Sequence, residues 1–127
     1  MATRATIKIE GVNFAKLYKH WDGYPEGILP WLIKFHKMFL TKRGYDPTYQ
    51  FAQLLRSSVD YEGEFDLDNS RITGYGIIEY DASAGEEYEY ILKKNGCIIV
   101  KENIYNEKTD ELEWKEIKSY NVLISKD

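Results

Sequence analysis

Hydrophobic and polar residues alternate at the start of the chain. Ala5, Ile7 and Ile9 are separated by polar or charged residues, and this period of two is typical of a β-strand with one buried face. Residues 11–13 provide a short connection, and residues 14–21 continue in a less regular alternation. The pattern predicts an N-terminal hairpin of two strands.

The alternation gives way to helical spacing of hydrophobic residues over positions 28–40. Pro25 or Pro30 suits the first turn of this helix, because a proline there gives up no hydrogen bond within the helix. Gly44 is placed to end it. The sequence therefore predicts one helix between the hairpin and Gly44.

A second helix is predicted directly afterwards. Asp46 precedes a proline and is typical of an N-cap, and apolar residues at helical spacing extend to about Val59. From Glu62 to Ser70 the periodicity is lost in an acidic segment, which predicts a loop.

Strand patterns return in the C-terminal half of the chain. Asn95-Gly96 separates two of these strands and predicts a hairpin with a type I′ turn, in which both central residues need a positive φ. The predicted strands are Tyr75 to Tyr80, Tyr88 to Lys93, Cys97 to Tyr105 and Leu112 to Leu123.

The predicted order is strand, strand, helix, helix and four strands. Short connections favour antiparallel neighbours, and two helices can cover one face of the resulting sheet. We expect residues 1–127 to form a single α+β domain, with two layers and a mainly antiparallel sheet of five to six strands.

The segment HWDGYPEG, residues 20–27, brings an imidazole, carboxylates and two aromatic rings together within eight residues. His20 and Asp22 are two residues apart, so in an extended strand they would share a face and could act as a base and its carboxylate. Catalysis also needs a nucleophile or a further ligand. No such signature accompanies them, and His36 belongs to the predicted helix.

Two other interpretations of the segment remain open. As a corner, Gly23 would take a positive φ, Asp22 would accept hydrogen bonds from free N–H groups at the helix start, and Trp21 and Tyr24 would pack on the core. As a recognition site, His20, Trp21, Asp22 and Tyr24 would be exposed together, and Trp and Tyr are enriched among residues that dominate binding energy.

Charge is unevenly distributed along the chain, whose net charge is −4. Six Lys and Arg residues lie between Lys16 and Arg43, whereas ten Asp and Glu residues lie between Asp60 and Glu89. We expect a negative surface that mimics nucleic-acid phosphates and occupies a basic groove on another protein. Outside the acidic loop, its members are Glu79, Asp81, Glu86, Glu87 and Glu89.

Several function classes are disfavoured by the sequence. Cys97 is the only cysteine, which excludes a disulfide or a thiolate cluster within one chain. No nucleophile elbow, zinc-protease motif or glycine-rich phosphate loop is present, and the acidic loop does not have the ligand spacing of an EF-hand. We therefore expect no catalytic residues, no metal and no cofactor.

The sequence also argues against a membrane or a nucleic acid as the partner. No apolar run is long enough to cross a membrane, so we expect a cytoplasmic protein with no membrane contact. Trp31 or Tyr45 could stack on bases beside the basic residues of the helical region, but the acidic balance argues against direct nucleic-acid binding.

Aromatic residues offer a second candidate surface. Tyr88 and Tyr90 share one strand face, and Tyr75, Tyr80 and Trp114 belong to neighbouring strands. Cross-strand aromatic packing explains such a group. If the helices cover only the other face, the rings would form an exposed surface that supports a homodimer or a nucleotide pocket.

Three segments resemble a known group of proteins. YKHWDGYPEG near the N-terminus, TGYGI at residues 73–77 and EYEYIL at residues 87–92 are similar to segments of small uncharacterised proteins from phages, prophages and archaeal viruses, which carry an HxDGYP-type motif. The resemblance covers about half of the chain. It implies an accessory protein of a mobile element, acting in the host cytoplasm, with counter-defence functions such as anti-CRISPR inhibition, and it assigns no residue roles.

Together these observations favour a non-enzymatic protein that binds and inhibits or sequesters a host factor, such as a nucleic-acid-binding defence effector. The surface would combine the corner at His20 to Tyr24 with the acidic segments. The alternative is a small-molecule-binding protein that holds a nucleotide in an aromatic pocket, either at a dimer interface or within one chain.

Overall fold

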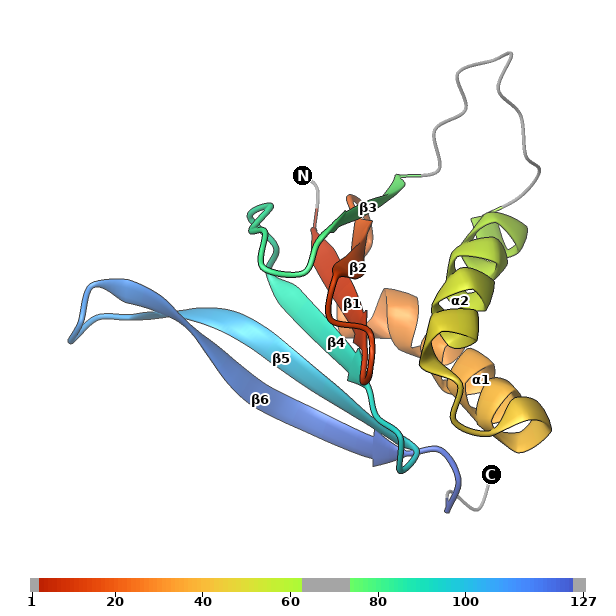
Figure 1. Ribbon diagram of the computed structural model, residues 1–127. Helices are drawn as coiled ribbons and strands as arrows, with labels where there is room; N and C mark the ends of the chain where they lie inside the picture. The colour runs from red at the N-terminus through yellow and green to blue at the C-terminus, as the bar shows by residue number, and fades with distance from the viewer. Residues whose placement is uncertain (1–2, 63–73, 125–127) are drawn as a thin grey trace, which may run out of the picture.

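The computed structural model describes residues 3–62 and 74–124, so the acidic loop beyond Glu62 lies outside the described residues (Figure 1). The predicted element order is confirmed. In chain order the elements are β1 (Ala5–Ile9), β2 (Ala15–Lys19), α1 (Pro25–Arg43), α2 (Pro47–Glu62), β3 (Tyr75–Glu79), β4 (Tyr88–Leu92), β5 (Cys97–Asn106) and β6 (Glu111–Asn121).

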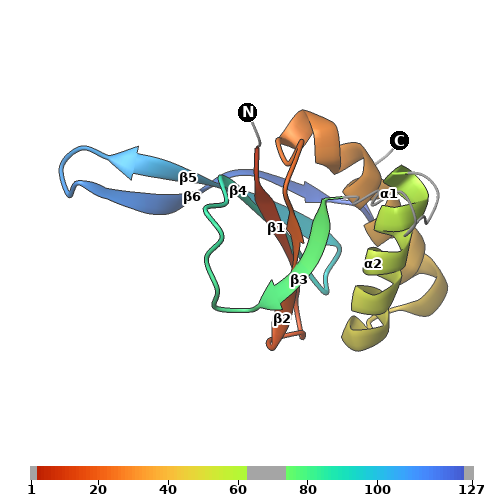
Figure 2. The same ribbon diagram turned by 90° about the horizontal axis from the view of Figure 1, so that it is seen from above.

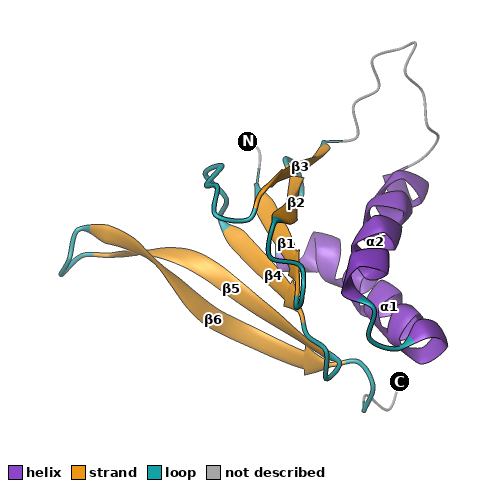
Figure 3. Cartoon of the chain, in the orientation of Figure 1, coloured by secondary structure: helices purple, strands orange, loops and turns teal. Residues whose placement is uncertain are grey.

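The strands form one six-stranded sheet in the order β3-β2-β1-β4-β5-β6 (Figure 3). Four of the five neighbouring pairs are antiparallel, and β1 with β4 is the parallel exception. β3 pairs with the edge of β2 that faces away from β1. Residues 80–87 then lead the chain to the free edge of β1, where β4 pairs in parallel. The predicted α+β class and mainly antiparallel sheet are confirmed.

Both helices lie against the same face of the sheet (Figure 2). Ile7, Leu17 and Tyr90 point from the sheet into a core that also contains Ile28 and Leu32 of α1. Burial of these side chains removes apolar surface from water and is the main stabilising contribution to the fold. The opposite face, which we call the uncovered face, carries no helix.

Strand register places most of the predicted aromatic group on the helix-covered face. Ala5 lies opposite Tyr88 and Ile7 lies opposite Tyr90, and residues directly opposite one another share a face. Tyr90 is completely buried. The expected exposed aromatic surface therefore does not form, since only Tyr80 and Trp114 of the five lie beside the uncovered face.

The boundaries of α1 follow the predicted signals. Pro25 occupies the first turn, and Pro30 lies further inside the helix. Gly44 caps the C-terminus with φ 80°, and its N–H donates to the carbonyl of Leu40. A side chain at this φ would be strained, which explains why the helix ends at glycine.

The β4–β5 hairpin is confirmed, but its turn type is not I′. Gly96 donates its N–H to the carbonyl of Lys93 at 3.1 Å and has φ 95°, whereas Asn95 is not among the residues with positive φ. Lys94 and Asn95 are thus the central residues of a type I turn that is followed by glycine in the left-handed region. The Asn95 side chain accepts the N–H of Cys97 instead, at 3.0 Å.

Candidate functional site

The corner between β2 and α1 is held by the backbone of Gly23. Its N–H donates to the carbonyl of Thr3 at 2.9 Å, and its carbonyl accepts the hydroxyl of Tyr90 at 2.6 Å. A Cβ at this position would lie 2.6 Å from the Cβ of Ala5. Glycine is required here because the chain passes close to β1.

Two details of the predicted corner are wrong. The positive φ belongs to Asp22, at 56°, and not to Gly23. Tyr24 is the N-cap of α1, and the helix start receives no side-chain hydrogen bond, so Asp22 does not cap it. Asp is among the residues that tolerate the left-handed region, which accounts for its place before the close-packed glycine.

His20 and Asp22 do not form a catalytic pair among the described contacts. The Nδ1 atom of His20 is 2.7 Å from the hydroxyl of Tyr18, and its ring meets the ring of Trp21 edge to face at 4.9 Å between centroids. The left-handed φ of Asp22 ends the strand alternation that would have placed both side chains on one face. Over residues 3–62 and 74–124, no group of three His, Cys, Asp or Glu side chains is arranged to hold a metal ion.

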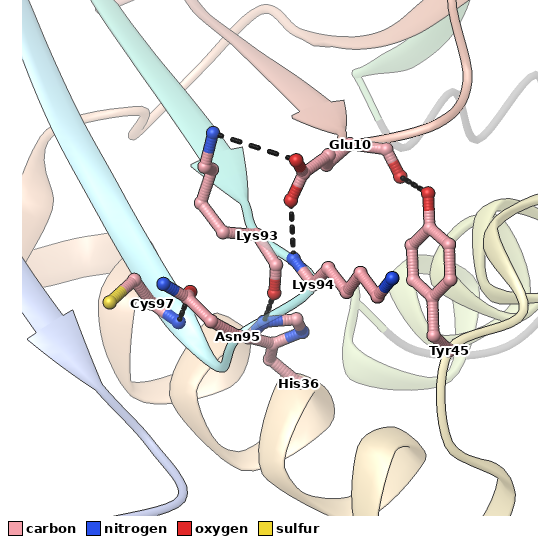
Figure 4. Close-up of polar contacts among 7 residues, drawn as sticks. All are labelled: Glu10, His36, Tyr45, Lys93, Lys94, Asn95 and Cys97. Carbon is pink, nitrogen blue, oxygen red and sulfur yellow. Dashed lines mark hydrogen bonds and ion pairs between the residues drawn. The ribbon is translucent and has the colours of Figure 1, made fainter.

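The second histidine, His36, has a structural role in the core (Figure 4). Its Nε2 lies 2.9 Å from the carbonyl of Lys93, which can only accept, so Nε2 carries the proton. Nδ1 then accepts the side-chain amide of Gln50 at 2.8 Å. Burial lowers the pKa of His36, although the bond to the carbonyl of Lys93 opposes this shift. The ring therefore ties α1 to α2 and to the β4–β5 turn.

The same turn is bound to the end of β1 by Glu10. Its carboxylate accepts the backbone N–H of Lys94 at 2.7 Å and lies 3.8 Å from the ammonium of Lys93, while its carbonyl accepts the hydroxyl of Tyr45 (Figure 4). Trp31 is buried and donates to Ser57 at 2.9 Å. The two rings considered for base stacking, Trp31 and Tyr45, are thus both engaged within the fold.

Trp21 and Tyr24 are partly exposed at the corner, with exposed fractions of 45% and 39%. Trp21 also packs against Gly74, the residue before β3, where an added Cβ would clash with its ring, and the N–H of His20 donates to the carbonyl of Gly74. The segment therefore builds the corner and also presents aromatic surface to solvent.

The structure separates the five predicted acidic residues into two groups. Glu79, Asp81 and Glu87 are exposed. Glu86 and Glu89 are buried in ion pairs, with Nζ of Lys16 3.6 Å from Glu86 and Nζ of Lys8 2.8 Å from Glu89. Of the five, only the first group is exposed enough to belong to the expected negative surface.

Both ion pairs lie in a cavity of about 400 Å³ on the uncovered face. Burial alone would raise the pKa of Glu86, but the N–H groups of Glu86 and Ala84 and the ammonium of Lys16 outweigh it and lower the pKa. The ammonium of Lys8 also lies 4.4 Å from the ring centre of Tyr80. The cavity lining further includes Asp81, Ala82, Ser83, Lys101 and Trp114.

The charges of three carboxylates act on Tyr88 at the end of the sheet beside the corner. Burial raises the pKa of the Tyr88 hydroxyl, and the negative charges of Glu102, Glu26 and Glu87 raise it further. These glutamates come from β5, the first turn of α1 and the residue before β4. We call Glu26, Glu87, Tyr88 and Glu102 the acidic end.

The corner and the acidic end meet at the N-terminal end of β1. Gly23 binds the carbonyl of Thr3, and the N–H groups of Glu87 and Tyr88 lie 2.9 and 3.3 Å from the carbonyl of Arg4. Glu26 and Glu102 were missed by the sequence analysis. A first-turn glutamate next to the motif was a signal for Glu26, whereas Glu102 joins the cluster only through the β4–β5 register.

A groove of about 520 Å³ between α1 and α2 carries the opposite charge. Phe35, Met38 and Tyr49 line it together with three basic side chains, which are Lys42, Arg43 and Arg56. Arg43 is engaged there, since it pairs with Asp46 at 3.1 Å and stacks over the ring of Tyr49.

None of the helices in the described part of the chain is long and apolar enough to cross a membrane. In comparisons with known proteins, no protein-family model, no curated protein and no solved structure matches this chain.

Proposed function

We propose that this protein is a non-enzymatic binding protein that captures a basic partner protein at the acidic end and the adjoining corner. The observation that carries the proposal is the meeting of these two segments at Thr3 and Arg4, which places exposed rings beside a cluster of carboxylates. Trp21 and Tyr24 would supply contact area, since aromatic residues dominate many interface energies.

Electrostatics supports a basic partner. Glu26 and Glu87 are exposed, and neither forms an ion pair among the described residues. A cluster of like charges is stabilised when a positive surface approaches it, and such complementarity speeds association and sets specificity. A groove that binds nucleic acid has the required positive potential.

The partner class follows from the resemblance of three segments to proteins of phages and archaeal viruses. On that basis we propose a host factor as the partner, in the host cytoplasm, with nucleic-acid-binding defence effectors such as CRISPR complexes as the first candidates. Binding would occupy the site of the nucleic acid and so inhibit the effector.

The test is direct binding of the purified chain to a panel of purified CRISPR effector complexes over a series of salt concentrations. We expect binding that weakens with salt and weakens about tenfold or more in the variant Glu26→Gln/Glu87→Gln. The matched control is Glu107→Gln/Glu111→Gln, which removes two exposed charges at the β5–β6 turn. Binding to no member of the panel, or equal binding by both variants, contradicts the proposal.

The cavity on the uncovered face supports a second candidate, a nucleotide-binding protein. Its volume of about 400 Å³ lies within the usual range of small-molecule pockets. Tyr80 and Trp114 could contact a base, and Lys101 could contact a phosphate. A ligand that binds only the native state raises its thermal midpoint, so a panel of nucleotides that produces no rise contradicts this candidate.

A further inference from the structure

Helices α1 and α2 lie side by side and run in opposite directions (Figures 1 and 2). Trp31 in the first half of α1 donates to Ser57 in the second half of α2. At the other end of the pair, Arg43 of α1 stacks over Tyr49, near the start of α2. The two helices therefore accompany each other along much of their length.

Two adjoining cavities form a continuous groove between these helices. The cavity of about 520 Å³ shares Phe35, Met38 and Ser57 with a second cavity of about 370 Å³. Their combined lining on α1 extends from Pro30 to Arg43, which at 1.5 Å per residue corresponds to about 20 Å. We call this surface the helix groove.

The floor of the helix groove is apolar. Trp31, Phe35 and Phe39 are buried there, whereas Met38 and Tyr49 are 47% and 57% exposed. Exposed apolar surface of this kind is typical of an interaction site when polar residues surround it. Met38 is suited to such a site, because its flexible side chain can adapt to the shape of an apolar partner.

Every charged side chain that lines the helix groove is basic. The four are Lys34, Lys42, Arg43 and Arg56. Arg43 pairs with Asp46, but the other three form no ion pair among the described residues. Residues 28–57 carry five Lys and Arg against one Asp, although the net charge of the chain is −4. The helix groove is thus a positive, partly apolar surface on an acidic protein.

From the apolar floor and the basic rim we infer that the helix groove binds an acidic amphipathic helix of a partner protein. Carboxylates on either side of the partner's apolar stripe would lie beside Lys34, Lys42 and Arg56, so the charges of the two surfaces are complementary. A helix of about four turns has the length of the groove.

Backbone hydrogen bonding favours a helix over an extended segment as the occupant. A helix satisfies its own N–H and C=O groups, whereas an extended segment needs a free strand edge to pair with. The helix groove is lined by residues of α1 and α2 alone and offers no such edge.

Shape and ring packing disfavour a membrane or a nucleic acid at this site. A lipid surface is bound by a helix that projects its apolar face, but the apolar residues here line a hollow. Single-stranded nucleic acid stacks on free aromatic rings. Trp31 is buried, and Arg43 lies over the ring of Tyr49. A protein segment therefore fits the groove best.

This interaction is independent of the one proposed at the acidic end. The acidic end would take a basic partner beside the start of β1, whereas the helix groove takes an acidic partner on the helical layer. The variant Glu26→Gln/Glu87→Gln should therefore bind acidic peptides like the wild type, and failure of either proposal leaves the other intact.

The experiment titrates the full chain into fluorescent synthetic peptides of about fourteen residues, in which Leu, Met or Phe occupies positions i, i+3, i+4 and i+7 and Glu flanks this stripe. One comparison peptide carries Lys in place of every Glu, and another carries Ser in place of the apolar stripe. We expect the acidic amphipathic peptides to bind with a Kd below about 100 μM, and the comparison peptides to show no saturable binding below about 1 mM.

Charge reversal tests the basic rim. Lys34→Glu/Lys42→Glu should weaken peptide binding about tenfold or more. The matched control is Lys37→Glu, since Lys37 is an exposed lysine of the same helix that lines neither cavity. Its affinity should stay within about threefold of the wild type at physiological ionic strength, where distant charges are screened. Circular dichroism checks that each variant is folded.

Met38 reports where the peptide binds. The chain has only two methionines, Met1 and Met38, so labelling their methyl groups with ¹³C places one nuclear magnetic resonance signal in the floor of the helix groove. The variant Met38→Leu identifies that signal by removing it. We expect it to shift progressively and to saturate at the same peptide concentration as the fluorescence.

Three outcomes overturn the inference. One is the absence of saturable binding by every acidic amphipathic peptide below about 1 mM. Another is binding that Lys34→Glu/Lys42→Glu and Lys37→Glu weaken equally, or that leaves the Met38 signal in place. The third is tighter binding of a single-stranded oligonucleotide or of phosphatidylserine vesicles that also requires Lys34 and Lys42, which would assign the groove to a nucleic acid or a membrane.

Discussion

The hydroxyl of Tyr90 donates a hydrogen bond of 2.6 Å to the carbonyl of Gly23, and so connects the centre of the sheet to the corner between β2 and α1. Tyr90 is completely buried, and burial, followed by the charges of Tyr88 and Glu26, raises its pKa far above the ordinary value. The hydroxyl therefore keeps its proton at neutral pH and donates it to the carbonyl of Gly23.

Tyr90→Phe should destabilise the protein by about 1–3 kcal/mol, because the buried carbonyl of Gly23 would lose its partner. The free energy of unfolding in urea measures this loss. Tyr105→Phe is the matched control: the Tyr105 hydroxyl donates to Asp110 at an exposed site, so its removal should cost less than about 1 kcal/mol. Equal losses in both variants would contradict the role given to Tyr90.

Gly23→Ala should also destabilise the fold, by about 1–3 kcal/mol, because the added Cβ would lie 2.6 Å from the Cβ of Ala5 and 2.9 Å from the carbonyl oxygen of Thr3. Gly76→Ala adds the same methyl group where no other atom lies within 4 Å and should be tolerated. Urea unfolding of the two variants makes the comparison. A tolerated Gly23→Ala would contradict close packing of the corner on β1.

His36 should make stability depend on pH. Because burial lowers its pKa in the folded protein, the unfolded chain binds the proton first as pH falls below 6.5. The contribution of the neutral ring is thus complete above 6.5 and is lost as pH falls towards the pKa of the folded state. Urea unfolding at about pH 7.5 and about pH 5.5 should show this loss in the wild type. The variant His36→Gln should show a smaller change between the two pH values, whatever its overall stability.

Lys16→Met should destabilise the protein by about 3 kcal/mol or more, because it leaves the buried carboxylate of Glu86 without its cation. Lys16→Met/Glu86→Leu should recover much of this loss, since two apolar side chains replace the pair. Thermal and urea unfolding of the two single variants and the double variant complete the cycle. Additive losses in the double variant would contradict a direct interaction.

The same ion pair affects how binding experiments are designed. Neutralising Glu86 or Glu89 breaks a buried pair with Lys16 or Lys8, so a loss of binding in such variants would report on folding. Glu86 contributes stability at pH values above 4.5, and this contribution is lost as pH falls through the lowered pKa of the folded state. Exposed Glu87 is the informative position.

Local patterns in the sequence determined the elements of this protein. The alternation of Ala5, Ile7 and Ile9 specifies a strand because successive side chains of a strand point to opposite faces. Gly44 ends α1 because a left-handed φ is strained for other residues. The hairpin at Asn95-Gly96 and the α+β class follow from signals of the same local kind, although the detailed turn geometry does not.

Tertiary structure alone decided how the elements meet. The parallel pairing of β1 with β4 places Tyr88 and Tyr90 under the helices, and no local period distinguishes that face from the other. The ion pair of buried Glu86 with Lys16 and the joint influence of Glu102 and Glu26 on Tyr88 depend on contacts between residues far apart in the chain. A period describes neighbours along one element, whereas register, burial and charge clusters arise from contacts between elements, so they become visible only in the folded protein.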